Sequence, residues 1–356
     1  MPSTLFPALP APRVMHRALR ARDASYDGVF FTAVRTTRVF CRPSCPARTP
    51  AARNVEFFPT PDQALAAGYR PCLRCKPLLA PGETPGWLRP LLRELEQDPG
   101  RRVTDAELRQ RGLSPERVRR WFLSTHGTTF QAWQRGRRVG RALDELRAGA
   151  DLTRTAHESG FESLSGFRAA FQGVVGAAPG RAREAVPVRL ERLVTPLGPM
   201  LAAASDEAVC LLEFDDRRGL PGQVEALARQ LGCVVVPGTC PPLRQLAREL
   251  DEYFLGERRA FETPLRAPGT PFQQAAWAAL RAIPYGQTRS YAEQAVAVGK
   301  PTATRAVARA NGLNRLAIVI PCHRVVGSDG QLTGYGGGLW RKKALLELER
   351  RTVAGG

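Results

Sequence analysis

Two groups of residues in this sequence have the types and spacing that chemistry requires, and the first is a cysteine followed directly by a histidine. Cys322 and His323 lie in the stretch NRLAIVIPCHRVVG, residues 314–327, between an apolar run and a Val-Val-Gly segment. A thiolate is a strong nucleophile, and an imidazole is well suited to take its proton near neutral pH. A lone cysteine in apolar surroundings is more often a buried core thiol. On these residues alone, both interpretations stay open.

The second group is a quartet of cysteines near the amino terminus. Three residues separate Cys41 from Cys45, and two separate Cys72 from Cys75. Each pair can hold one side of a tetrahedral ion, and four thiolates without a histidine are typical of a closed structural zinc site. The metal would also supply folding energy to a block that has few large apolar side chains. The alternative is four unrelated thiols, but the paired spacing favours one Zn²⁺ ion per chain.

Length and charge narrow the class of protein. The 356 residues predict more than one domain. Lys and Arg number 52 against 33 Asp and Glu, a formal charge of +19, which favours a polyanionic partner; the alternative is a genome rich in Arg codons. The eight cysteines indicate thiol or metal chemistry in a reducing compartment. Four prolines interrupt the first 20 residues and no run of 18 apolar residues follows, so we expect no secretory signal, no membrane span and a cytoplasmic location.

Proline and glycine divide the chain at residues 77–86 and 176–189. The first block carries two strand-like runs, GVFFTAV and NVEFF, beside the cysteine quartet. The second block has a helical pattern. The third opens with the strand-like runs VRLERLV, AVCLLEF and CVVV, and we expect only helices after about residue 270, around the Cys-His pair.

Signals for helix starts and stops recur in both helical regions. Capping boxes and N-terminal prolines mark starts, and an Asn-Gly pair marks an end. In chain order, the signals are Thr104 with Glu107, Ser114-Pro115-Glu116, Ser290 with Glu293, Thr302 as a cap, and Asn311-Gly312 as an end.

The stretches FFTAVRTTRVFCRPSCPAR, NVEFF and ALAAGYRPCLRCKP together resemble the amino-terminal zinc domain of the Ada family, bacterial adaptive-response proteins that repair methylated DNA and activate transcription. The resemblance implies that Cys41 is both a zinc ligand and the acceptor of a methyl group from a methylphosphotriester. A zinc-bound cysteine stays a nucleophilic thiolate at neutral pH. Methylation removes one negative charge, and the weaker repulsion of DNA phosphate then predicts tighter promoter binding.

The stretches LSPERVRRWFLSTHGTTFQAWQRGRRVGRAL and AHESGFESLSGFRAAFQGVVGAAPGRAR resemble the paired helix-turn-helix units of AraC-class regulators. In such folds the second helix of each unit enters the major groove, and nearby cations hold phosphates. For any one arginine, the alternative is a solvated helix face. The candidate DNA contacts are Arg117, Arg119, Arg120, Ser163, Ser165 and Arg168.

The stretch IPCHRVVGSDGQLTGYGGGLWRKKALLELE resembles the active-site region of the O6-alkylguanine-DNA alkyltransferases, and the resemblance extends back to about residue 190. It implies that Cys322 attacks the alkyl carbon on guanine O6 in a single displacement. His323 would take the thiol proton through a water, Glu349 would orient His323, and Asn314 would brace the turn. Because a thioether has no easy leaving route, the protein would be consumed once per lesion.

Access to the lesion is the second requirement, because the methyl carbon lies inside a stacked duplex until the nucleotide is flipped out. The resemblance implies a helix-turn-helix in the minor groove, with Arg305 filling the vacated space. Tyr291 would push the phosphate, and Tyr335 would form a pocket wall. Gly336 stands where relatives carry a larger residue, which predicts a roomier or less hydrogen-bonded pocket and leaves the lesion preference open.

The three resemblances cover consecutive blocks, so the chain is identified as a member of the Ada family. The expected fold is multi-domain α+β. The expected parts are a zinc-binding methylphosphotriester acceptor domain at 1–82, an all-α paired helix-turn-helix domain at 83–186, a ribonuclease-H-like α/β subdomain at 187–268 and a helical, winged-helix-like catalytic subdomain at 269–356. The expected function is irreversible methyl transfer, with methylation of Cys41 activating transcription and with DNA and RNA polymerase as partners.

Other functions remain alternatives. A repair protein could retain both DNA-binding regions without a working methylation switch. A regulator that only senses lesions would lack the acceptor Cys322, which is present, and a Cys-His hydrolase would need an oxyanion hole that no motif indicates. Cys210, Cys233 and Cys240 match no motif, and the first two lie in apolar strand-like runs typical of core thiols.

Overall fold

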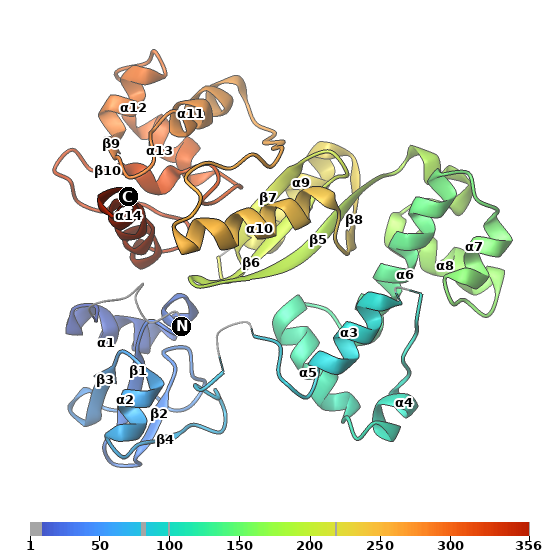
Figure 1. Cartoon of the computed structure of the whole chain (residues 1–356), viewed down its shortest axis with the longest axis horizontal. Coiled ribbons are helices and arrows are strands. Elements are labelled where there is room, and N and C mark those ends of the chain that lie inside the picture. Colours follow the sequence, from blue (N-terminus) through green and yellow to red (C-terminus); the bar gives the residue numbers. More distant parts are fainter. Residues whose placement is uncertain (1–8, 80–82, 99, 218, 356) are drawn as a thin grey trace.

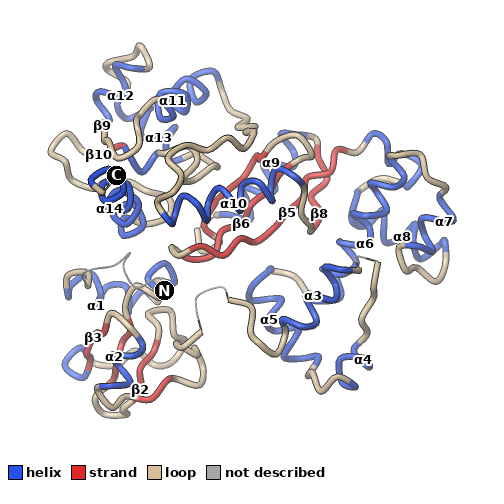
Figure 2. The backbone as a smooth tube through the Cα atoms, viewed as in Figure 1, coloured by secondary structure: helices blue, strands red, loops and turns tan. Residues whose placement is uncertain are grey.

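The structure is a computed structural model that describes residues 9–79, 83–98, 100–217 and 219–355. In chain order it comprises a small sheet with helices, a group of helices, a second sheet with helices, and a final, mainly helical part (Figure 1). Figure 2 shows the two four-stranded sheets, the amino-terminal one and the second one, as separate groups of strands. This order agrees with the expected multi-domain α+β class. Among the described helices, none is long and apolar enough to cross a membrane.

The amino-terminal part is built on a four-stranded sheet in the order β3-β1-β2-β4. Both strand-like runs predicted here form strands, and the sheet gains two more. Thr60 caps α2 by accepting from the Gln63 N–H. The elements are α1 Pro12–Ala21, η1 Ala24–Tyr26, β1 Phe31–Val34, β2 Val39–Cys41, η2 Ala52–Asn54, β3 Val55–Phe58, α2 Pro61–Ala66 and β4 Arg70–Pro71.

The small sheet brings the two cysteine pairs together. Strand β2 ends at Cys41 and pairs in parallel with β4, which ends one residue before Cys72. The Cys72 N–H donates to the Phe40 carbonyl at 3.0 Å. Asp27 fixes the loop after Cys41, because its carboxylate accepts from the Ser44 N–H at 3.1 Å and from the Ser44 hydroxyl.

The middle part consists of two two-helix units joined by a long helix, α6. The capping box of Thr104 with Glu107 is confirmed, and Ser114 caps α5 by accepting from the Arg117 N–H. The first unit is α4–α5 and the second is α7–α8. The elements are α3 Arg89–Gln97, α4 Asp105–Gln110, α5 Pro115–His126, α6 Phe130–Arg147, α7 Leu152–Glu158, α8 Leu164–Val175 and η3 Pro179–Glu184.

The break predicted at residues 176–189 is not a free connector, because η3 and the start of β5 lie within it. Helix α6 packs against the second sheet through two glycines one turn apart. A Cβ on Gly136 would come within 2.9 Å of Pro237, and one on Gly140 within 3.2 Å of Val236. The absence of side chains at these positions lets the helix approach the strand closely.

The second sheet has the order β7-β6-β5-β8, with helices on its faces (Figure 1). All three predicted strand runs are confirmed. Strand β6 was not predicted, because its sequence GPMLAAA is rich in residues that disfavour strands. Cys210 lies in the apolar cluster of this sheet, as expected. The elements are β5 Val186–Thr195, β6 Gly198–Ala204, β7 Val209–Phe214, α9 Leu220–Leu231, β8 Cys233–Pro237 and α10 Pro241–Leu255.

The final part is mainly helical. The capping box of Ser290 with Glu293 is confirmed and α13 ends at Gly312 as expected, but Thr302 does not cap it: the N-cap is Ala303, without a side-chain hydrogen bond. A short parallel pair, β9 with β10, corrects the expectation of helices alone. The elements are α11 Pro271–Arg281, β9 Arg289–Ser290, α12 Tyr291–Ala297, α13 Thr304–Gly312, η4 Cys322–Arg324, β10 Val325–Val326 and α14 Leu339–Ala354.

One apolar core joins the second sheet to the final part. It includes Phe214 from β7, Tyr253 from α10, Trp277 from α11 and Leu345 from α14. Trp340 at the start of α14 packs against this core and also against the apolar cluster around α1. The helix that carries Glu349 therefore contacts both this shared core and the amino-terminal part.

Candidate active site

Cys322 begins the short helix η4 and is partly buried against the shared core. Its Sγ accepts a hydrogen bond from Asn314 Nδ2 at 3.3 Å. Burial raises the pKa of Cys322, while this hydrogen bond and the positive charges of Lys342 and Arg217 act in the opposite direction. Because the pKa remains above its usual value, the thiol is protonated at neutral pH and needs a base.

Asn314 braces the turn that leads to Cys322. Its Oδ1 accepts from the Leu316 N–H at 2.9 Å, and its Nδ2 also donates to the Ile320 carbonyl at 2.8 Å. Between them, Ile318 has a φ of 71°, a left-handed conformation that is costly for a β-branched residue. The surrounding hydrogen bonds hold this strained residue in place.

His323 and Glu349 form a fully buried pair. The imidazole Nε2 lies 2.8 Å from Oε1 of Glu349. An ionised carboxylate can only accept, so Nε2 carries the proton and Nδ1 the lone pair. Within the described part of the chain, Nδ1 has no hydrogen-bond partner. Burial lowers the pKa of His323 although Glu349 acts against this, so the imidazole is neutral at neutral pH.

Glu349 accepts hydrogen bonds from further donors, which sequence reasoning missed. Arg324 donates to both carboxylate oxygens at 2.9 Å, the Tyr253 hydroxyl to Oε1 at 2.8 Å and the Gly286 N–H to Oε2 at 3.0 Å. Burial opposes ionisation of Glu349, but the hydrogen bonds and charges of His323 and Arg324 outweigh it and lower its pKa to about 2. The sequence did offer a signal for Arg324. It directly follows the Cys-His pair, and a buried carboxylate such as Glu349 needs a positive charge beside it.

Lys342 is a second missed residue. Its amine is buried and donates to the carbonyls of Thr333, at 2.6 Å, and Val325. Burial lowers the pKa of Lys342 to about 8, and the charge of Cys322 acts in the opposite direction. The positive charge of Lys342 therefore favours the thiolate form of Cys322.

The two tyrosines expected at the lesion pocket lie at the loop before α14. The Tyr291 hydroxyl donates to the Thr333 carbonyl at 3.3 Å, which joins α12 to the loop before α14. The Tyr335 hydroxyl has no partner among the described residues; burial raises the pKa of Tyr335 well above its usual value, and the charge of Cys322 raises it further. Arg305 is exposed on the first turn of α13.

Gly336 does not widen the pocket on the side where its Cβ would point. A Cβ at this position would lie 2.7 Å from Cζ of Arg217. The guanidinium group of Arg217 fills the space that a larger residue would take. The expectation of a roomier pocket is therefore wrong on this side of the loop.

The cysteine quartet forms one cluster. The four Sγ atoms all lie within 4.8 Å of one another, and the Arg42 N–H donates to Cys75 Sγ at 3.4 Å. Cys45 and Cys72 are buried, whereas Cys41 and Cys75 are partly exposed. The hydrogen bond with Cys75 and burial raise the pKa of Cys41, and the charges of the other cysteines raise it further.

This geometry fits a zinc ion. Zn–S bonds of about 2.3 Å in a tetrahedron separate the sulfurs by about 3.8 Å. Cys45 and Cys72 Sγ are 4.0 Å apart, so small side-chain shifts would bring the ligands into place. A divalent cation would also relieve the mutual repulsion that opposes ionisation of the four thiols.

The candidate DNA contacts of the middle part lie on the second helix of each two-helix unit. Arg117, Arg119 and Arg120 are exposed on α5, and the Arg117 guanidinium stacks 4.2 Å above the ring centre of Trp87. On α8, Ser165 and Arg168 are exposed. Ser163 instead caps this helix, because its hydroxyl accepts from the Gly166 N–H.

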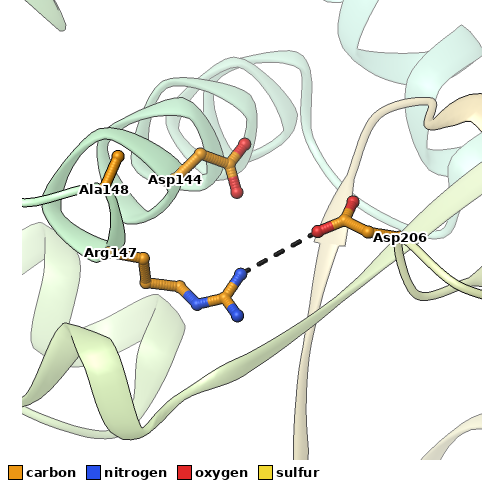
Figure 3. Close-up of a pocket in the computed structure, with 4 residues that line it drawn as sticks. All are labelled: Asp144, Arg147, Ala148 and Asp206. Carbon is orange, nitrogen blue, oxygen red and sulfur yellow. Dashed lines mark ion pairs between the residues drawn. The ribbon is translucent and has the colours of Figure 1, made fainter.

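A pocket between α6 and the β6–β7 turn involves none of these residues (Figure 3). It is lined by Asp144, Arg147, Ala148 and Asp206, and the guanidinium of Arg147 lies 3.9 Å from the carboxylate of Asp206. Ion pairs of this length near the surface contribute little. The lining contains no thiol or imidazole, and we assign it no chemistry.

Four family models match the chain in consecutive ranges. The match to the metal binding domain, together with the sulfur cluster, confirms the structural zinc ion. The matches to the helix-turn-helix domain and to the DNA binding domain confirm DNA as a partner. The models are the metal binding domain of Ada at residues 14–77, a helix-turn-helix domain at 108–185, the ribonuclease-like domain of 6-O-methylguanine DNA methyltransferase at 189–267 and the DNA binding domain of that methyltransferase at 271–351.

Similar proteins span nearly the whole chain. The regulatory protein Ada of Salmonella typhimurium is 39% identical over 342 residues, which cover 93% of this chain and 94% of the relative. The bifunctional transcriptional activator/DNA repair enzyme Ada of Escherichia coli K12 is 37% identical over 343 residues, with coverage of 94% and 95%. A solved structure of Mycobacterium tuberculosis OGT in complex with DNA is 41% identical, with coverage of 47% of this chain and 94% of that chain and a TM-score of 0.40. Because the match to both Ada proteins extends over almost all of each sequence, this chain belongs to the Ada family.

Proposed function

We propose that this chain repairs alkylated DNA by transferring a methyl group from O6 of guanine to Sγ of Cys322, once per molecule. The observation that carries this proposal is the setting of Cys322: Asn314 donates a hydrogen bond to its sulfur, and the next residue, His323, forms a buried pair with Glu349. Relatives named methylated-DNA–protein-cysteine methyltransferases support the same reaction. The chain is then a single-turnover methyltransferase.

The chemistry needs the thiol proton to leave. His323 takes the proton of Cys322 on Nδ1 through an intervening water, because side chains of adjacent residues seldom face each other. The thiolate attacks the methyl carbon, the S–C bond forms as the C–O6 bond breaks, and the imidazolium returns its proton to the guanine. Glu349 holds the Nε2 proton and stabilises the imidazolium. The products are unmodified guanine and a stable thioether.

The lesion reaches Cys322 after the nucleotide leaves the stack. Helices α12 and α13 form the helix-turn-helix that enters the minor groove, with Arg305 in the vacated space. The exposure of Arg305 supports this role. Tyr291 pushes the flanking phosphate, and Tyr335 stacks against the extruded base.

Cys41 is the second methyl acceptor, for methylphosphotriesters of the DNA backbone. Zinc, when bound by Cys41, Cys45, Cys72 and Cys75, keeps the four thiols deprotonated at neutral pH. The partial exposure of Cys41 supports its access to a phosphate. Its methylation converts a thiolate into a neutral thioether, which reduces repulsion of DNA phosphate and strengthens promoter binding.

Binding of a promoter uses the second helix of each unit in the middle part. The exposed α5 and α8 residues support this, and Ser163 contributes by fixing the start of α8. RNA polymerase is the partner that activation requires, and the cytoplasm is where bacterial DNA is read. The second candidate function is repair without a methylation switch. The proposed borders of the four parts are those expected from the sequence: 1–82, 83–186, 187–268 and 269–356.

The test is intact mass with peptide mapping after incubation with duplex DNA that carries both O6-methylguanine and methylphosphotriesters. We expect one methyl on Cys322 and one on Cys41. Cys322→Ser should lose the first methyl and keep the second, whereas Cys233→Ser, a partly exposed strand thiol, should keep both. Transfer to Cys322 alone would favour repair without the switch, and transfer to neither would refute the proposal.

A further inference from the structure

Arg217, three residues after β7, reaches from the second sheet into the segment before Cys322. Its Nη2 donates to the Gly312 carbonyl at 2.6 Å, and its Nη1 to the Asn314 carbonyl at 3.2 Å. Gly312 is the last residue of α13, and cations at helix C-termini satisfy carbonyls that have no partner within the helix. One side chain thus joins the end of the expected recognition helix to the residue that braces Cys322.

The same guanidinium lies against the lesion-pocket loop. A Cβ on Gly336 would lie 2.7 Å from Cζ of Arg217 and 3.0 Å from its Nε and Nη1. Any other residue at position 336 would therefore displace the guanidinium or the loop. Gly336 directly follows Tyr335, so the position of Arg217 and the wall of the pocket depend on each other.

A buried carboxylate holds Arg217 in this position. Glu213 pairs with the guanidinium, and their side chains are 1% and 12% exposed. The other oxygen of Glu213 accepts from the Phe214 N–H at 3.1 Å. Charged groups this deeply buried need each other, because an isolated charge in the interior is costly. The pair is therefore a fixed part of the site rather than a mobile surface contact.

We propose that Arg217 is a positioning residue for methyl transfer. It fixes the position of Asn314 and, through Asn314, the position of Cys322, and it holds the pocket wall at Gly336. This inference rests on the proposed function of Cys322. Arg217 acts through the carbonyl of Asn314, whose side chain donates to Sγ. Its fork of donors suits two carbonyls and a carboxylate at once, which the single ammonium of lysine does not.

Electrostatics give Arg217 a second effect on the same thiol. Burial raises the pKa of Cys322, and the charges of Lys342 and Arg217 partly reverse this. A neutral residue at position 217 therefore leaves a smaller thiolate fraction at a given pH. This effect can be separated from geometry, because a lysine at 217 keeps the charge and loses the fork.

The experiment compares the full-length protein with three variants. Glu213→Gln/Arg217→Gln removes both charges without leaving a buried carboxylate unpaired. Arg217→Lys keeps the charge, and Gly336→Ser pushes the guanidinium aside. Arg259→Gln is the matched control, because exposed Arg259 also joins the two subdomains, through the Thr352 carbonyl at 3.4 Å, and lies outside the turn that Asn314 braces.

Two rates are measured for each protein: single-turnover methyl transfer with saturating O6-methylguanine duplex, and alkylation of Cys322 by iodoacetamide against pH, followed by peptide mapping. For the double variant we expect transfer to slow about tenfold and the alkylation midpoint to move to higher pH. Arg217→Lys should keep the midpoint but transfer more slowly, Gly336→Ser should slow transfer, and the control should match the wild type.

The inference is overturned if the double variant and Gly336→Ser both keep the wild-type transfer rate and the wild-type alkylation midpoint. The same holds if only the melting temperatures of these variants fall. If the wild type itself transfers no methyl to Cys322, the proposed function fails. The iodoacetamide midpoints then still decide whether Arg217 acts on the thiol.

Discussion

Nε2 of His323 lies 2.8 Å from Oε1 of Glu349, and neither side chain is exposed to solvent. The same carboxylate accepts hydrogen bonds from the guanidinium of Arg324, which favours its ionised form. Glu349 therefore stays ionised while His323 remains neutral until it takes a proton. The pair works as an orienting device for the base, and the carboxylate is not a second proton acceptor.

Replacement of His323 tests the base. His323→Gln should slow methyl transfer to Cys322 about a hundredfold, because the thiol loses its proton acceptor. In the wild type, burial holds the pKa of His323 below 6.5, so the rate should stay level as pH falls to that value and drop only when the imidazole itself is protonated. Single-turnover transfer rates measured from about pH 5 to about pH 8, on both sides of the ordinary histidine pKa, check this prediction.

The matched control for the base is His157→Gln, because His157 is an exposed residue of α7. It should leave the rate and its pH dependence unchanged. A wild-type rate in His323→Gln would remove His323 from the mechanism.

Replacement of Glu349 tests its contribution to stability. The pKa of Glu349 is about 2 in the folded protein, against the usual 4.5 of a glutamate carboxyl. The carboxylate therefore stabilises the fold above about pH 4.5 by on the order of 3 kcal/mol, and this contribution is lost as pH falls from 4.5 towards 2. Glu349→Gln should lower the opening free energy of α14 amides, measured by hydrogen exchange at pH 7, and should abolish this acid dependence.

Glu347→Gln is the control for Glu349 on the same helix. Glu347 makes a 3.6 Å pair with the exposed side chain of Lys343, so its loss should cost less than about 1 kcal/mol. Equal protection of α14 in the wild type and Glu349→Gln would mean that the buried network adds nothing to stability.

Removal of zinc should unfold the amino-terminal part selectively. The metal supplies on the order of 10 kcal/mol of folding free energy to sites of this kind. With a chelator, hydrogen-exchange protection of β1 to β4 should collapse, while transfer to Cys322 continues because its core lies in the second sheet and the final part. Cys72→Ala should reproduce the loss without chelator. Full protection of β1 to β4 in metal-free protein would contradict the structural role of the ion.

A cation on α8 should contribute to promoter binding. Arg168→Ala should weaken DNA binding and reduce the slope of log affinity against log salt by about 1, if the residue contacts a phosphate. Fluorescence anisotropy across a salt series measures this. The control is Arg154→Ala, because Arg154 pairs with Glu158 on the first helix of the same unit. Identical slopes for the two variants would exclude a phosphate contact by Arg168.

Short-range features of the fold were predictable from the sequence because they depend on neighbouring residues. Thr104 with Glu107 and Ser290 with Glu293 form capping boxes whatever the rest of the chain does, since each box closes within one turn. The prediction failed at Thr302, where the local signal was weaker: the N-cap is Ala303, so the helix begins one residue later than expected. Strand β6 was missed because its pairing with β5 and β7, rather than the propensity of its alanines, makes it a strand.

For the sites, the sequence by itself determined which residues carry the chemistry: the spacing of Cys41, Cys45, Cys72 and Cys75 predicts the zinc site, and the motif around Cys322 identifies the acceptor. Only the tertiary structure decided what surrounds them. Arg324 and Tyr253 meet at Glu349, and Arg217 lies against Gly336, although these residues are far apart in the chain. Such partners have no local signature, because a buried charge is satisfied by whichever donor the packing of the core brings to it.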